Sequence, residues 1–106
     1  MTDLKNQCDA KITVINPHEA KLSGRIDRLV GKDLSIEGRR LIAASGKQWR
    51  IDLTGVHHSS SVGIALLLDW LRYAKSNNIE IEFENVPEKM RQVIEFSGLT
   101  EIFNLN

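Results

Sequence analysis

The residues best suited to chemistry lie together in the middle of this chain. Two adjacent histidines, His57 and His58, run directly into the serines Ser59 to Ser61, and Asp52 lies just upstream. Serine, histidine and aspartate are the components of a hydrolytic triad. However, the nucleophile elbow Gly-x-Ser-x-Gly is absent, and adjacent residues of one segment seldom align as nucleophile and base. We therefore predict no catalytic residue and no enzyme activity.

The histidines do not predict a metal site either, because neighbours in an extended segment point to opposite faces. The third histidine, His18, falls in a predicted hairpin, and the single Cys8 cannot supply the usual multi-cysteine zinc site. Gly55 and Gly63 lack the spacing of a phosphate-binding loop. We expect no cofactor and no metal, and nothing in the sequence supports nucleotide binding.

Composition narrows the function further. The chain has 106 residues, is 42% hydrophobic and 26% charged, and has a formal net charge of zero. It therefore lacks the basic excess that nucleic-acid binding requires. No apolar run approaches the roughly 18 residues of a membrane span, and the N-terminus has no apolar core of a secretory signal. We expect a flexible tail at residues 1–10, one domain at residues 11–106 and a reducing, cytoplasmic setting.

Alternating apolar residues predict four strands, in a mixed sheet with one wet face. They fall near 11–15, 20–23, 49–53 and 79–83, and the first two form a hairpin ending at Gly24. A polar loop is expected after the third strand. Glu80, Glu82, Glu84 and Glu88 form an acidic edge that we interpret as a solvated strand face that discourages edge pairing.

Three helices complete an α/β domain of order β-β-α-β-α-β-α, with the helices mainly on one face. The first is predicted at about 33–45, with Asp33 as N-cap and Gly46 as the stop, and Gly31 and Gly38 weaken it and leave its start open. The second spans 61–76. The third begins at Pro87 and ends before Gly98 as a left-handed C′ residue. The positions predicted to face inward are Leu34, Leu41, Ile42, Met90, Val93 and Ile94.

The second helix has two distinct faces. Ile64, Leu67, Leu71 and Ala74 recur at helical spacing and should face the sheet. The opposite stripe is small or charged, and bulky apolar residues flank it. This pattern fits either a deeply packed helix or an exposed edge that docks a partner. The stripe consists of Ser61, Ala65, Asp69, Arg72 and Ser76, and its flanks are Leu66, Leu68, Trp70 and Tyr73.

At this level of detail the chain resembles the STAS domains, the fold of anti-sigma factor antagonists. The resemblance covers nearly the whole chain. It is carried by Asp52-Leu53-Thr54-x-Val56 with Ser61 and Gly63, by Leu22-Ser23-Gly24 and by Ser97-Gly98-Leu99. Segments 63–71 and 85–90 look most like one subgroup, the small cytoplasmic subunit of the Mla phospholipid-transport ABC transporter of Gram-negative bacteria.

The resemblance implies two functions of different kinds. In the transporter subgroup it implies docking on the ATPase subunit, at the cytoplasmic face of the inner membrane. In anti-sigma factor antagonists it implies a kinase partner that phosphorylates the hydroxyl matching Ser61. Many antagonists have an aspartate where this chain has Ser60, which favours the transporter function. The serines could also simply cap the helix. The expected partner-binding residues are His58, Ser59, Ser60, Ser61, Ala65, Asp69 and Arg72, with Ser61 as the phosphoacceptor-like position.

Overall fold

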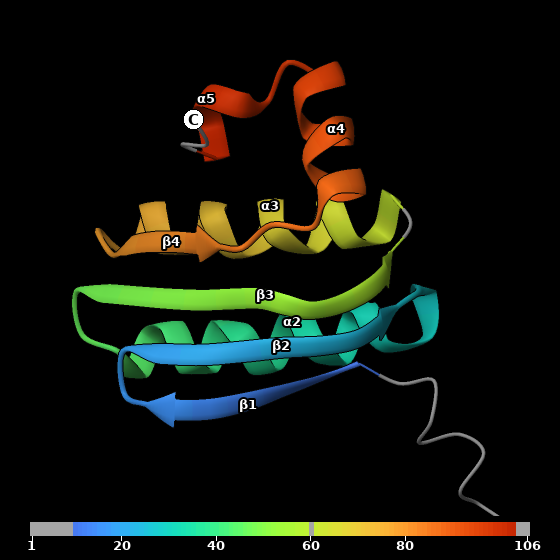
Figure 1. Cartoon of the computed structure of the whole chain (residues 1–106). Helices are drawn as coiled ribbons and strands as arrows, with labels where there is room; N and C mark the ends of the chain where they lie inside the picture. Colours follow the sequence, from blue (N-terminus) through green and yellow to red (C-terminus); the bar gives the residue numbers. More distant parts are fainter. Residues whose placement is uncertain (1–9, 60, 104–106) are drawn as a thin grey trace, which may run out of the picture.

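Four strands form one sheet in the order β1-β2-β3-β4 (Figure 1). The computed structural model describes residues 10–59 and 61–103, and of residues 29 and 57–59 only the backbone. β1 pairs antiparallel with β2, while β2–β3 and β3–β4 are parallel, so the sheet is mixed as predicted. The elements are β1 (Lys11–Asn16), β2 (Glu19–Ile26), α2 (Arg28–Ala44), β3 (Gln48–Ser59), α3 (Ser61–Ser76), β4 (Glu80–Glu84), α4 (Glu88–Phe96) and α5 (Thr100–Phe103).

The two long helices form a layer on one face of the sheet. In Figure 1, α2 and α3 lie behind the strands, and α4 and α5 lie beyond β4. The predicted alternation is confirmed in β2 and β3, whose apolar residues point into this layer and are buried. The predicted inward face of α3 is buried as well. These core residues are Ala20, Leu22, Trp49, Ile51, Leu53, Ile64, Leu67, Leu71 and Ala74.

A buried tryptophan on α3 fixes the distance between the two long helices. The Trp70 ring is fully buried and meets Trp49 of β3 edge to face, with ring centroids 5.7 Å apart. On its other side it lies directly against Gly38 of α2, where an added Cβ would lie 2.1 Å from the indole nitrogen. Trp70 Nε1 donates to the carbonyl oxygen of Ser35 at 3.4 Å. The indole therefore links β3, α3 and α2.

The predicted start of the first helix was wrong. α2 begins at Arg28, and the Asp27 carboxylate, not Asp33, accepts from the free backbone N–H of Val30 at 3.3 Å. Glycine costs about 1 kcal/mol in a helix. A buried indole removes roughly 200 Å² from water, about 5 kcal/mol at 25 cal/mol per Å². Burial of the Trp70 ring against Gly38 therefore outweighs the cost of a glycine inside the helix.

The polar loop predicted after the third strand was also wrong. β3 continues through Ser59, because its parallel pairing with β2 extends to Ile26 across two register shifts. β2 correspondingly runs past Gly24, where the hairpin was expected to end. The extra length brings β3 directly to the start of α3.

The end of α4 follows the predicted pattern. Gly98 has φ of +75°, and its N–H donates to the carbonyl of Glu95 at 3.1 Å. The N–H of Leu99 donates to the carbonyl of Ile94 at 2.9 Å, which completes a Schellman motif. Met90 and Ile94 are buried as expected, but Val93 is 46% exposed, so its predicted inward position was wrong.

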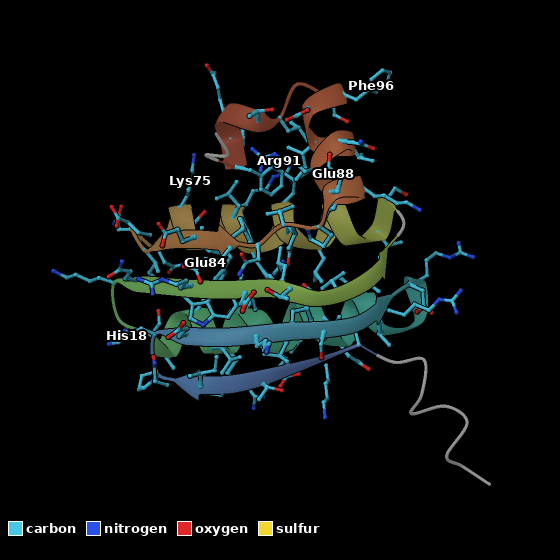
Figure 2. All side chains as sticks on the ribbon, in the orientation of Figure 1. His18, Lys75, Glu84, Glu88, Arg91 and Phe96 are labelled. Carbon is cyan, nitrogen blue, oxygen red and sulfur yellow. The ribbon has the colours of Figure 1, made fainter. Side chains whose placement is uncertain are left out.

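After this turn the chain folds back as α5, which the sequence pattern did not predict. Phe103 of α5 is buried against Phe83 of β4, with ring centroids 5.4 Å apart. Phe96, by contrast, is 95% exposed and projects from the end of α4 (Figure 2). In the described part of the chain, no helix has the length and apolarity to cross a membrane.

Gly38→Ala tests the helix spacing. Alanine would stabilise an unconstrained helix by about 1 kcal/mol. Here we expect it to lower the free energy of unfolding by about 1–3 kcal/mol, because the methyl group displaces the Trp70 ring. Chemical denaturation measures the effect. Gly31→Ala is the control, since its Cβ would meet only a Val62 methyl at 2.9 Å, and its loss should be smaller. A stabilised Gly38→Ala protein would contradict the account.

Candidate functional site

An open groove lies between α2 and the first half of α3. It has a volume of about 300 Å³. Ala65 is exposed on the α3 side, and Arg28 and Lys32 are exposed on the α2 side. The lining residues are Arg28, Gly31, Lys32, Ser35, Val62, Ala65, Leu66 and Asp69.

One carboxylate closes the far end of this groove. Asp69 of α3 is bound by the guanidinium of Arg39 through Nε, at 3.0 Å, and through Nη2. The hydroxyl of Ser35 donates to the same carboxylate. The Arg39 hydrogen bond, assisted by Ser35, holds the pKa of Asp69 below its usual value, against a smaller opposing effect of burial. Asp69 thus links α2 to α3 as a charged anchor.

The residues of the predicted outward stripe of α3 therefore differ in their exposure. Ser61, Ala65 and Arg72 are exposed, as a docking surface requires. The Asp69 side chain is only 28% exposed, and its oxygens are occupied by the other helix. Two of the flanking residues, Leu66 and Trp70, are buried, which supports deep packing for that part of the helix.

Three of the predicted binding residues cannot be placed in full. Ser60 lies outside the described residues, as do the side chains of His58 and Ser59, although β3 carries the backbone of both. Ser61 is the first residue of α3, so the residue before the helix is Ser60. The prediction that a serine caps α3 consequently stays a prediction.

The α2 side of the groove was missed in the sequence. Arg28, Lys32, Ser35 and Arg39 follow one another at steps of four, three and four, which places them on one helical face. This signal was present in the sequence. It was overlooked because a helix beginning at position 33 excludes the two cations.

Asp52 has a structural role beside the site. Its Oδ1 accepts from the backbone N–H of Thr54 at 2.9 Å and from Asn85 Nδ2 at 3.0 Å, and the Thr54 hydroxyl donates to it as well. The Thr54 hydroxyl, followed by Asn85, lowers the pKa of Asp52. Asn85 has φ of +54° in the turn that leads from β4 to α4. Asp52 therefore ties β3 to that turn.

The arrangement is suited to binding. The groove has apolar walls from Val62 and Leu66, two basic side chains at one rim, and a carboxylate already neutralised by Arg39. The positive end of the α3 dipole lies at Ser61, beside the cations of α2. Among the described residues, no cluster of three or more histidines, cysteines or carboxylates could hold a metal ion.

Comparison with known proteins identifies the family. Residues 16–105 match the family described as Mlab, STAS domain, so the chain belongs to this STAS family. No curated protein matches the chain significantly.

Solved structures support the same fold. A chain of the Acinetobacter MlaFEDB complex in an ATP-bound conformation is 29% identical, with a TM-score of 0.73, over 83% of this chain and 93% of that one. The anti-sigma factor antagonist SpoIIAA in its unphosphorylated form is 16% identical, with a TM-score of 0.70, over 88% and 84%. An antagonist from Mycobacterium paratuberculosis is 21% identical, with a TM-score of 0.70, over 92% and 83%. The antagonists share the fold.

The charged anchor predicts a pH-dependent stability. Because the pKa of Asp69 is lowered in the folded protein, its contribution is complete above the unfolded value near 3.8 and is lost as pH falls through the folded value. Asp69→Asn should cost about 1 kcal/mol or less at pH 7, since the pair is partly exposed. Denaturation at several pH values should show this difference shrinking below about pH 4. Asp33→Asn, an exposed change on α2, is the control. A difference independent of pH would contradict the anchor.

Proposed function

We propose that this STAS-family chain is a non-enzymatic subunit that docks on the ATPase of a phospholipid-transport ABC transporter. The observation that carries the proposal is the likeness to a chain of the Acinetobacter MlaFEDB complex over most of both chains. The sequence agreement is greater there than with the anti-sigma factor antagonists. ATP hydrolysis would belong to the partner, and the chain would support or regulate it.

The groove between α2 and α3 is the proposed docking surface. Ala65 leaves room for an apolar side chain of the partner between Val62 and Leu66. Arg28 and Lys32 would pair with carboxylates beside that side chain, and the α3 dipole adds to the same positive field. The complementary partner surface is therefore an apolar residue flanked by acidic ones.

The charged anchor supports this function by making the groove rigid before the partner arrives. Arg39 and Ser35 hold Asp69 from the α2 side, so docking need not order the two helices against each other. A preformed site loses less conformational entropy on binding. The proposed surface extends from this anchor to Ser61 and includes the serines and His58 at the end of β3. Arg72 extends the same exposed stripe beyond the anchor.

The alternative function is partner switching through phosphorylation of Ser61. The observation that favours it is the exposed hydroxyl in the first turn of α3. A phosphate there would add about −1.5 to −2 charges beside a helix end carrying roughly +0.5. It would repel a partner that presents carboxylates to the same groove. Ser60, where many antagonists have aspartate, counts against this alternative.

For the location of the protein, we propose the cytoplasmic face of the inner membrane. It would be held there by the transporter and would make no membrane contact of its own.

Ala65→Arg tests the docking surface. The long cation fills the groove, and we expect at least a tenfold loss of affinity, because the apolar contact is replaced by a buried charge. The tagged protein is purified from its host in gentle detergent, the co-purifying chains are identified by mass, and the affinity of the isolated ATPase is measured. Lys89→Arg, an exposed change on α4, should bind normally. Equal binding by both variants would refute this surface.

Ser61 variants separate the two functions. Under partner switching, Ser61→Asp abolishes binding, Ser61→Ala retains it, and the partner transfers phosphate from ATP to Ser61. Under transporter docking, both variants weaken binding at most moderately and no phosphate is found. Recovery of a soluble kinase in place of an ABC ATPase and its permease would overturn the proposed function.

A further inference from the structure

A second cavity lies at the opposite end of α3, where β4 forms the edge of the sheet. Its volume is about 410 Å³. Lys75 comes from the last turn of α3 and projects between β4 and α5 (Figure 2). The cavity is lined by residues of β3, α3, β4 and α5, among them Leu71, Lys75, Glu80, Ile81, Glu101 and Phe103.

One edge of β4 lies beside this cavity. β4 is the last strand in the order β1-β2-β3-β4, so among the described residues only one of its sides is paired with another strand. In a parallel ladder, alternate residues direct their N–H and C=O groups to the same neighbour. Glu80 donates its N–H to the carbonyl of Lys47 at 2.8 Å, on the side of β3. Ile81 and Phe83 therefore direct theirs toward the free edge.

Isoleucines form one part of the cavity wall. Ile102 of α5 is 44% exposed although it lies beside the buried Phe103. Ile81 of β4 is half-buried, and Ile79 lies in the same wall. An apolar side chain from an added strand would cover Ile81 and Ile102 together.

The charge around this apolar surface is negative. Three carboxylates line the cavity. One of them, Glu82, forms an ion pair with Arg50, at 3.3 Å from its Nε. Glu80 and Glu101 form no ion pair with any described residue, and Lys75 is the only cation among the described lining residues. These carboxylates disfavour an acidic or purely apolar strand, as edge charges generally do. They favour a strand that carries basic side chains.

We propose that this cavity binds an extended, basic segment of a partner protein. The segment adds to β4 as a further strand, through hydrogen bonds to Ile81 and Phe83. It places an apolar side chain against Ile102 and a lysine or arginine beside Glu80 and Glu101. Main-chain pairing supplies affinity here, and the alternating apolar and basic side chains supply specificity.

This second surface is independent of the proposed groove. Ser61 and Lys75 lie at opposite ends of α3, which at a rise of about 1.5 Å per residue are roughly 20 Å apart. Both surfaces can be occupied at the same time. The domain would then join the protein docked on α2 and α3 to a second chain carrying the basic segment.

The test titrates the ¹⁵N-labelled full chain with a synthetic peptide of sequence Lys-Val-Arg-Val-Lys, capped at both ends. We expect saturable shifts of the amides of Ile81, Phe83 and Ile102. Two peptides serve as controls: one replaces the basic residues with glutamate, and the other replaces the valines with serine. Neither control peptide should give saturable shifts. The first is repelled by the carboxylates, and the second lacks the apolar side chains that contact Ile102.

Charge reversal on the protein completes the test. Glu80→Lys with Glu101→Lys should weaken the basic peptide at least about tenfold, because two attractions become repulsions. Glu37→Lys with Glu95→Lys changes net charge equally at other sites and should leave affinity nearly unchanged. Equal weakening by both pairs, or equal binding of the serine peptide, would overturn the proposal. Shifts of the same amides on concentrating the protein alone would make a second copy the occupant and overturn it too.

Discussion

The packing of the Trp70 indole into the space left by Gly38 sets the geometry on which the rest of the structure depends. It joins the central strand β3 to both long helices, and it sets how closely they approach. An open groove lies between the same two helices at the N-terminal end of α3. Arg39 binds Asp69 across these helices as well. Core packing and the candidate surface are therefore built on the same pair of helices.

Much of the fold could be predicted from the sequence because apolar periodicity decides it. The inward face of α3 and the alternation of β2 and β3 needed only the spacing of residues such as Leu67 and Ile51. The turn at Gly98 followed from local chemistry in the same way. The errors arose where a distant contact overrides a local preference. Gly38 weakens an isolated helix, yet only glycine leaves room for the ring of Trp70.

Only the α3 side of the candidate site could be predicted from the sequence. The stripe through Ser61 and Ala65 followed from helical spacing on α3. The α2 wall was missed because the helix was started too late, and with it the basic rim at Arg28. Nor could the sequence show that Asp69 is held by Arg39, since thirty residues separate them and only the packing of the helices brings them together. The preferred partner followed from the family resemblance, because no physical property of the residues identifies an ATPase.

The central claim is that the exposed stripe of α3 faces an ABC ATPase in the cell. The most direct test places a photo-crosslinking amino acid at Arg72, irradiates the native host and identifies the crosslinked chain by mass. The account predicts that the ATPase subunit is crosslinked from this position. The same amino acid placed at Lys89 on α4 should crosslink little or no ATPase. A soluble kinase crosslinked from Arg72, or equal capture of the ATPase from both positions, would contradict it.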